Sequence, residues 1–403
     1  MTLDLSDPAF WARPMAEREE AFDQLRALDR PAFFEEMEIS FAPRGPGYHA
    51  LVRHADILEA SRNPEVFSSG QGGATNIPDM PPEFTEYFGS MINMDDPRHA
   101  RLRRIVSRAF TPKMIKQFEL DVQAEAARIV AGLQSGDDFV LKAASRLPLK
   151  IICDMMGIGE ESYDFVFERS NFILGGFDPE YTGGNLEDLA TRLLAAGMEL
   201  QELVQRLASA EPRGLTAALV NANIDGERLT MQELGSFFIL LVIAGNETTR
   251  NAISYGLRLL TRNPAQRALL LEDLDGRLPG AVEEIVRLAS PVNFMRRKVT
   301  RDFTMNGNLY REGEKVVLFY WAANRDPSVF ASPYSFDILR NPNPHVGYGG
   351  PGPHFCLGAH LARREITVLF RELLTRLPHI EGGKPDRLHS SFINGIKHMQ
   401  CTF

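Results

Sequence analysis

The chain has 403 residues, of which 44% are hydrophobic and 24% are charged, and its formal net charge at pH 7 is −9. This is the composition of a folded globular protein, and the length alone suggests roughly two or three domains. The net acidity argues against a nucleic-acid partner. The longest apolar run, residues 237–244, is about half as long as a membrane span, so no membrane span is expected.

The cysteines and the N-terminal segment indicate a cellular compartment. Cys153, Cys356 and Cys401 are too few and too scattered for a disulfide framework. The first residues are acidic and lack the apolar core of a secretory signal. We therefore expect a reducing, cytoplasmic location.

Helical patterns dominate the chain. Apolar residues recur at helical spacing in 97–134 and 185–209, and Pro264 and Pro279 are expected to open two shorter helices. Strand patterns are few, and the expected fold class is mainly α with small β-sheets. The expected strands lie at 48–53, 299–305 and 314–319, with a C-terminal hairpin around Asn394-Gly395.

The clearest helix begins at Thr230. Thr230 and Glu233 have the spacing of a capping box, an apolar run follows directly, and Asn263-Pro264 ends the segment. A helix of about 30 residues is roughly 45 Å long, enough to cross a whole domain.

Gly and Pro residues gather at 70–82 and 341–353, where we expect long loops of the kind that carry function. The second loop delivers Cys356 just ahead of a helix that continues to about Leu377. Unpaired N–H groups and the positive end of the helix favour a thiolate there. Gly352 and Gly358 leave room for a flat ligand. The alternative, a small buried cysteine in a turn, is disfavoured by the density of Gly, Pro and His.

Two other interpretations of this loop are weaker. A G-x-G-x-x-G spacing begins at residue 347, but Pro342 and Pro344 exclude the strand that must precede a dinucleotide site. A zinc site built on His354, Cys356 and His360 lacks the second Cys/His pair.

The loop resembles the haem-binding loop of cytochrome P450, F-x-x-G-x-x-x-C-x-G, and matches it at Gly352, Cys356 and Gly358. His354 matches a position that contacts a haem propionate in many members. The aromatic residue, Tyr348, stands one place further from the cysteine than the pattern has it. Some actinobacterial members that act on lipids and sterols look similar, with one extra residue in the loop.

The long helix contains A-G-N-E-T-T, which resembles the A-G-x-D/E-T-T segment of the same family. An acid beside an alcohol in an apolar helix is costly unless it is used, and a Thr hydroxyl can bond to a carbonyl one turn earlier. The alternative is a helix with two polar residues on its wet side. The resemblance implies that Ala244 and Gly245 contact the haem and that Glu247 and Thr248 handle proton delivery.

Glu284 and Arg287 share one face of a short helix and resemble the E-x-x-R of the family, a buried ion pair that braces the cysteine loop. The family's third member, a cation, is expected at Ser335, which cannot serve. Either Arg340 substitutes for it or the triad is reduced to a pair.

Three further residues resemble haem-propionate ligands of the family. His99 and Arg103 match H-x-x-x-R, and they lie one helical turn apart, where they can clamp an anion. Arg297 resembles another such ligand, with Arg296 as its close competitor. The motifs follow the family's order from 93 to 361, so we expect one cytochrome P450 domain over 1–403.

Family membership implies haem b with Cys356 as axial thiolate ligand and O2 as co-substrate. The implied reaction inserts one oxygen atom into a C–H bond, and the other leaves as water. The chain shows no flavin or iron–sulfur motif, so electrons are expected from an external ferredoxin and an NAD(P)H-dependent reductase. Two alternatives, a peroxide-driven peroxygenase and a non-catalytic haem-thiolate sensor, are disfavoured by the Glu247-Thr248 pair.

The docking face for an acidic ferredoxin is expected on a basic stretch without acids. Its members are Arg98, Arg101, Arg103, Arg104, Arg108, Lys113 and Lys116, with Arg363 and Arg364 beyond the cysteine.

The substrate is expected to be a large apolar molecule, because the candidate pocket residues are mostly apolar. Several stretches resemble bacterial members that hydroxylate methyl-branched lipids, sterol side chains or terpenoids, and the residues do not choose among the three. The candidate pocket residues are Val242, Asn246, Val292, Phe294, Phe392 and Ile393.

Overall fold

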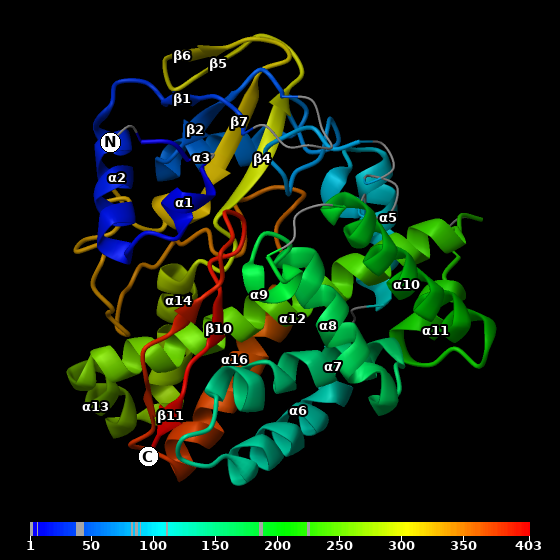
Figure 1. Cartoon of the computed structure of the whole chain (residues 1–403), viewed down its shortest axis with the longest axis vertical. Coiled ribbons are helices and arrows are strands. Elements are labelled where there is room, and N and C mark those ends of the chain that lie inside the picture. The colour runs from blue at the N-terminus through cyan, green and yellow to red at the C-terminus, as the bar shows by residue number, and fades with distance from the viewer. Residues whose placement is uncertain are drawn as a thin grey trace.

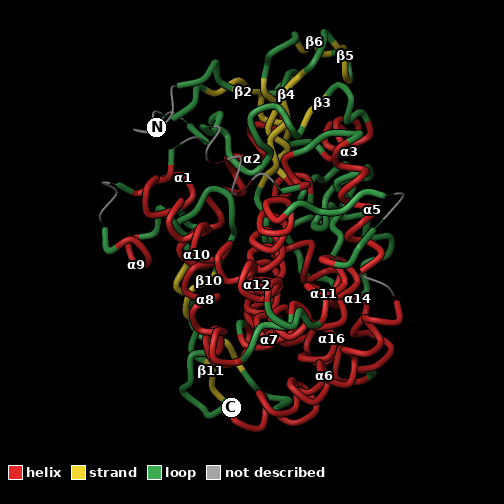
Figure 2. The backbone as a smooth tube through the Cα atoms, turned by 90° about the vertical axis from the view of Figure 1, so that its right-hand side faces the viewer, coloured by secondary structure: helices red, strands yellow, loops and turns green. Residues whose placement is uncertain are grey.

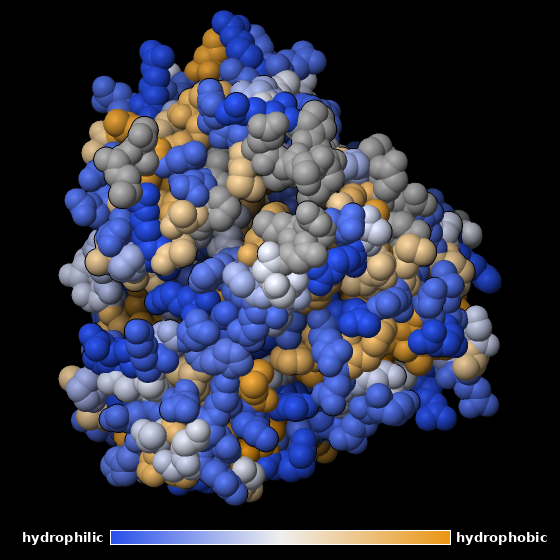
Figure 3. Space-filling model, viewed as in Figure 1, coloured by the Kyte–Doolittle hydropathy of each residue, from blue (hydrophilic) through white to orange (hydrophobic). Residues whose placement is uncertain are grey.

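The computed structural model describes residues 3–5, 7–37, 44–81, 84, 88, 90–109, 112–184, 188–223 and 226–403, without the side chains of 8, 108–109 and 112–119. Most strands lie at one end of the molecule together with the N-terminal helices, most helices fill the other end, and the C-terminal strands lie among these (Figure 1). Within the described residues, no helix is both long and apolar enough to cross a membrane. Polar residues cover most of the face in Figure 3, between scattered apolar ones.

The long helix α12, Met231–Arg262, runs through the middle of the helical part (Figure 2). The predicted capping box is confirmed: Glu233 N donates to Thr230 Oγ1 at 3.1 Å, and Thr230 N donates to Glu233 Oε2 at 3.0 Å. The helix ends at Asn263, as expected. It packs against α7 (Arg146–Met156), α8 (Tyr163–Leu174), α10 (Leu189–Ser209), α14 (Leu274–Ala289) and α16 (Ala359–Arg376).

The remaining helices surround this group. The pattern over 97–134 forms two helices, α5 and α6. The bounds of the helices outside the central group are α1 Pro8–Trp11, α2 Met15–Ala27, α3 His54–Arg62, α5 Arg98–Ala109, α6 Pro112–Gly132, α9 Pro179–Thr182, α11 Gly214–Val220, α13 Pro264–Glu272 and α15 Tyr320–Ala323.

The largest sheet among the described residues has five strands in the order β1-β2-β7-β4-β3. β2 and β7 run parallel, and the other neighbours are antiparallel. β7 is buried along its whole length, because helices and loops cover both of its faces. The five are β1 Phe33–Phe34, β2 Tyr48–Leu51, β7 Lys315–Phe319, β4 Phe294–Val299 and β3 Phe67–Ser68.

Three two-stranded ribbons complete the β structure of the described chain. They pair β5 (Phe303–Met305) with β6 (Asn308–Tyr310), β8 (Glu381–Gly382) with β11 (Cys401–Thr402), and β9 (Asp386–Arg387) with β10 (Ile396–His398).

Two local predictions are wrong, and the third, the C-terminal hairpin, is confirmed as the β9–β10 pair but with a longer loop than expected. Pro279 lies inside α14, which begins earlier because Asp273 caps it by accepting from Gly276 N at 3.0 Å. The strand expected at 299–305 is two strands, β4 and β5, separated by a turn. Asn394-Gly395 is not the turn of a tight hairpin. Its Asn394 side chain instead binds Tyr255 Oη and the Ala289 carbonyl, at 2.8 and 2.6 Å.

Candidate active site

Two cavities adjoin each other beside α12. The cysteine cavity has a volume of about 240 Å³ and is lined by Cys356 and by residues of α12. The apolar cavity has a volume of about 300 Å³ and is lined by residues of α12 and by several loops. Because some residues line both, the two spaces meet at this boundary. The shared residues are Ile92, Leu240, Ala244, Thr248, Val292 and Met295.

The exposed surface of Cys356 faces the cysteine cavity inside the protein. The residue sits just before α16, with its backbone N–H donating to the Tyr348 carbonyl at 2.9 Å. Burial raises the pKa of the thiol, while the N–H groups of Gly358 and Ala359 and nearby arginines act in the opposite direction. The helix end therefore favours the thiolate as expected, but in the protein alone burial outweighs it.

Four of the predicted haem ligands, His99, Arg103, Arg297 and His354, line the same cavity. The rings of His99 and His354 are 4.3 Å apart between centroids. Burial, reinforced by the charges of Arg297, His99 and Arg103, lowers the pKa of His354 to about 3. Among the described residues, the buried His99 Nε2 has no hydrogen-bond partner. Cations and an unpaired polar atom that face one cavity indicate an anionic ligand.

The competing arginines, Arg296 and Arg297, lie on opposite faces of strand β4, because consecutive side chains of a strand point to opposite faces. Arg297 lines the cysteine cavity, whereas Arg296 is 0% exposed and lines neither cavity. Arg296 instead donates to Asp79 Oδ1 at 2.7 Å and to the Ile77 carbonyl at 3.2 Å. Arg297 is therefore the arginine that is available to a ligand in the cavity.

The acid–alcohol pair on α12 is split between two environments. Thr248 lines both cavities, and its Oγ1 donates to the Ala244 carbonyl at 2.8 Å. Glu247 is 1% exposed, pairs with Arg250 and accepts from Asn251 Nδ2 at 3.1 Å. Unlike Thr248, Glu247 lines neither cavity, because one residue along a helix turns the side chain by about 100°.

The predicted pocket residues on α12 are corrected for the same reason. Val242 and Asn246 are fully buried and line neither cavity. Leu240, Ala244 and Thr248, spaced four apart, face the cavities instead. Gly245 lines the cysteine cavity, where a Cβ would approach Ile152 Cδ1 to 3.2 Å. The other four predicted pocket residues, Val292, Phe294, Phe392 and Ile393, do line the apolar cavity.

Arg340 replaces the cation that Ser335 cannot supply. Glu284 receives two hydrogen bonds of 2.7 Å from Arg287, and Arg340 Nε lies 3.2 Å from both of its carboxylate oxygens. Arg287 also donates to the Asn324 and Pro333 carbonyls, at 2.7 and 2.6 Å. The buried group is a triad that ties α14 to the chain leading into the cysteine loop.

Two glycines of the cysteine loop have different tasks. A Cβ at Gly358 would meet nothing within 4 Å, and Gly358 lines the cysteine cavity. Gly352 has φ +139°, and a Cβ there would lie 2.3 Å from the Ser61 carbonyl oxygen. Gly352 therefore permits backbone packing against α3 rather than ligand approach. Tyr348 lines the cavity, with the Arg363 guanidinium 4.1 Å from its ring centroid.

Several side chains of the expected ferredoxin-docking face are paired with acids or turned into the cysteine cavity. Arg101 donates to Glu227 and Glu233, each at 2.9 Å, and Arg363 pairs with Glu283. Arg103 donates to the Phe355 carbonyl at 2.6 Å and lines the cysteine cavity. Acids from distant segments thus neutralise part of the expected docking face. The side chains of Arg108, Lys113 and Lys116 lie outside the described residues.

Sequence reasoning missed Glu365, which is 3% exposed and lines the cysteine cavity. The available signal was its place on the apolar stripe of α16, four residues from Leu361 and from Leu369. Burial raises the pKa of its carboxyl group to about 8. The side chain is therefore mostly neutral at pH 7.

Replacing Glu365 with Gln is expected to change how stability depends on pH. The folded state keeps a proton that the unfolded state releases between about pH 4.5 and 8, so wild-type stability falls through this window by up to ~1.4 kcal/mol per pH unit. The variant lacks this loss, and denaturant unfolding at pH 5, 6, 7 and 8 measures the difference. In the control Glu372→Gln, on the same helix and paired with Arg376 at 2.9 Å, the dependence should match the wild type. A parallel profile for Glu365→Gln would contradict the neutral form.

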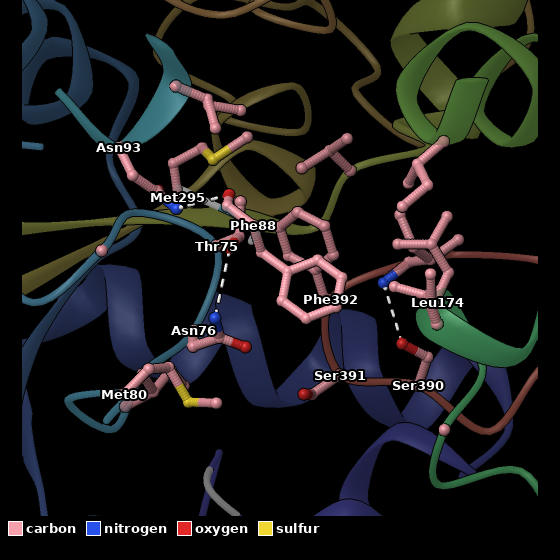
Figure 4. Close-up of a pocket in the computed structure, with 18 of the residues that line it drawn as sticks. Thr75, Asn76, Met80, Phe88, Asn93, Leu174, Met295, Ser390, Ser391 and Phe392 are labelled. Carbon is pink, nitrogen blue, oxygen red and sulfur yellow. Dashed lines mark hydrogen bonds between the residues drawn. The ribbon is translucent and has the colours of Figure 1, made fainter. Parts of the chain in front are cut away.

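The apolar cavity is lined by residues of α12 and by loop residues within 73–80 and 390–393, several of which Figure 4 labels. Phe88 and Phe392 lie in the middle of the view, with Leu174 on one side and Met295 on the other. Asn93 holds the 71–80 loop, because its Oδ1 accepts from Ala74 N at 2.8 Å. The cavity is suited to a long or polycyclic apolar molecule.

Comparison with known proteins places this site in context. The cytochrome P450 family model matches residues 196–403. A methyl-branched lipid omega-hydroxylase of Mycobacterium tuberculosis is 46% identical, over 100% of this chain and 94% of its own. A steroid C26-monooxygenase of Mycolicibacterium smegmatis is 38% identical, over 89% and 84%. A Mycobacterium marinum cytochrome P450 solved with pseudoionone superposes with a TM-score of 0.93 at 42% identity, covering 100% and 99%.

Proposed function

The chain belongs to the cytochrome P450 family and is a monooxygenase, and from this we propose that it hydroxylates the chain end of a branched, apolar lipid. The observation that carries the proposal is the junction of the two cavities at Thr248. An elongated apolar substrate in the apolar cavity can present only its end at this junction. The relative named as an omega-hydroxylase matches this chain over its whole length.

The residues of the cysteine cavity fit a haem. A flat macrocycle with two carboxylates requires a metal ligand, open space beside it and cations at one edge. Cys356, the open side of Gly358 and the partnerless His99 Nε2 meet these needs. We propose that Cys356 would ligate the iron of haem b and that His99, Arg103, Arg297 and His354 would bind its propionates. The haem supplies activation of O2, so that one oxygen atom enters a C–H bond and the other leaves as water.

The chain contributes position and a proton. Thr248 carries a hydroxyl at the boundary of the two cavities, and we propose that this hydroxyl, which donates to the Ala244 carbonyl in this structure, relays a proton into the cysteine cavity. The apolar lining excludes water and holds the substrate in one orientation. Glu247 is bound to Arg250, so we propose that it positions α12 and that Thr248 alone of the pair acts at the boundary.

Replacing Thr248 with Ala is expected to preserve substrate affinity within about twofold and to divert electrons from product to peroxide. The variant loses the hydroxyl that lines both cavities. Proton delivery by a positioned side chain typically accelerates a reaction by on the order of 10²-fold. Product, NADH consumed and hydrogen peroxide are measured together. Thr248→Ser retains the hydroxyl and should restore coupling. Tight coupling in Thr248→Ala would contradict this role.

The proposed function is tested by product analysis on the haem-loaded enzyme. Branched fatty alcohols and esters, sterols and terpenoids are supplied with O2, NADH, a ferredoxin and its reductase, and the oxidised position is located by mass spectrometry. Terminal hydroxylation of a branched lipid is the expected result, and oxidation only at ring positions would contradict it. Turnover with hydrogen peroxide alone would favour a peroxygenase, and binding without turnover in any mixture would favour a sensor.

Further proposals concern the setting of this chemistry. We propose that electrons come from a separate ferredoxin and an NAD(P)H-dependent reductase, as is usual for monooxygenases that carry haem alone. We propose that residues 1–403 act as one domain, since the cavity linings draw on residues from Met37 to Ile393. The free thiols of Cys153 and Cys401 support a cytoplasmic location.

A further inference from the structure

The apolar cavity offers hydrogen-bonding groups but no charge. Its described lining residues include no Asp, Glu, Lys, Arg or His. Segments beside it in the sequence that lie outside the described residues, 38–43, 82–83, 85–87 and 185–187, contain no Lys, Arg or His. A carboxylate in this cavity would therefore lose its hydration without gaining a cation, which is costly.

Apart from Thr248, the polar groups of the apolar cavity do not belong to the lining that it shares with the cysteine cavity. Thr75, Asn76, Ser390 and Ser391 line the apolar cavity only. Figure 4 shows Asn76 and Ser391 on the same side of the Phe392 ring. A substrate that fills the apolar cavity with one end at Thr248 can therefore meet these groups with the rest of its length.

Three of these groups have unused hydrogen-bonding capacity. Asn76 Nδ2 donates to Thr75 Oγ1 at 3.2 Å, which leaves the Asn76 carbonyl oxygen and the Thr75 hydroxyl proton without a described partner. The Ser391 hydroxyl likewise has no partner among the described residues, whereas Ser390 Oγ accepts from Ile393 N at 3.1 Å. Together they offer an acceptor and two hydroxyl donors.

Hydrogen bonds to the main chain hold the two segments that carry these groups. Arg296 N donates to the Ala74 carbonyl at 2.7 Å, and its guanidinium donates to the Ile77 carbonyl and to Asp79. On the other side, Asn293 Nδ2 donates to the Ser391 carbonyl at 2.9 Å. Binding to a fixed subsite loses less conformational entropy than binding to a mobile one.

We propose that Thr75, Asn76 and Ser391 form a subsite for an uncharged hydrogen-bonding head group, so that the substrate is an alcohol, ketone or ester rather than a free acid. The proposal rests on the proposed function, because it assumes that the other end of the substrate is hydroxylated at Thr248. A head-group subsite also fixes how far the chain reaches toward the junction.

The test compares three ligands with one branched chain: the primary alcohol, the free acid and its methyl ester. Dissociation constants are measured with the haem-loaded enzyme at pH 7.5 by calorimetry and by the substrate-induced absorbance change. The alcohol and the ester are expected to bind about tenfold or more tightly than the acid. The hydrocarbon without a head group serves as the reference for apolar contact alone.

Variants assign the effect to the subsite. Asn76→Leu and Ser391→Ala should each weaken alcohol binding by about fivefold and leave hydrocarbon binding within about twofold. Asn76→Lys adds the missing cation and should strengthen acid binding relative to ester binding by about tenfold. Ser209→Ala, at the exposed end of α10, is the matched control and should change nothing.

The outcomes separate the two proposals. If the acid binds as tightly as the ester and is hydroxylated at its chain end, the proposed function stands and the subsite is overturned. Equal losses for alcohol and hydrocarbon in Asn76→Leu and Ser391→Ala would also overturn the subsite. If the four ligands fail to bind at all, the proposed function fails and the subsite fails with it.

Discussion

Replacing Cys356 with Ser is expected to abolish hydroxylation and to remove the thiolate signature from the spectrum of the reduced carbon-monoxide complex. A serine alcohol stays protonated where a cysteine thiolate coordinates, so the electron donation that favours O–O cleavage is lost. Absorbance spectra and product analysis measure the two effects. The four cationic and polar partners of the cavity remain, so the variant should still hold some haem.

The matched control for this prediction is Cys401→Ala. Cys401 is buried at the C-terminal ribbon, and its Sγ lies 3.9 Å from the Gln134 carbonyl, far from the cysteine cavity in the fold. This variant should retain the signature and the activity. A normal signature in Cys356→Ser would show that another residue is the ligand.

Replacing Glu284 with Gln is expected to destabilise the protein by about 3–5 kcal/mol. Glu284 and Arg287 are both 0% exposed, and the Glu284 carboxylate also binds Arg340, Asn343 Nδ2 at 3.1 Å and Asp337 N at 3.0 Å. Gln keeps the shape but leaves two guanidinium groups without their countercharge. Denaturant unfolding measures the loss, and haem retention on gel filtration should fall with it.

Glu272→Gln is the matched control, because Glu272 forms a surface pair with Arg277 at 2.8 Å on the neighbouring helix. Exposed pairs of this kind contribute about 1 kcal/mol or less. If Glu284→Gln lost no more than this control, the triad would not brace the cysteine loop.

Sequence reasoning succeeded where the signal is local. The capping box at Thr230, the helix after Cys356 and the spacing of His99 and Arg103 depend on neighbours a few residues apart, and the structure has them as expected. It failed on the rotation of α12, because that helix is apolar on several faces and periodicity alone cannot say which one meets a cavity. Val242 and Asn246 were therefore placed on the wrong side.

Partners that come from distant segments were beyond reach for a different reason. Arg101 is neutralised by Glu233 from 132 residues away, and Arg340, which the sequence offers only as one of two alternatives, completes the Glu284 triad from 56 residues away. Nothing in the local pattern distinguishes these pairs from solvated charges. The choice between Arg296 and Arg297 likewise needed the strand's orientation.

The way in which Arg296 holds the 71–79 loop has an evolutionary consequence. Arg296 and Lys315 donate hydrogen bonds to main-chain carbonyl oxygens of this loop, at Ala74 and Ile77, and both pair with the Asp79 carboxylate. The side chains at Thr75 and Asn76 are therefore not needed to keep the loop in shape. A lineage can exchange them, and with them the class of lipid it accepts, without first acquiring compensating mutations in the scaffold.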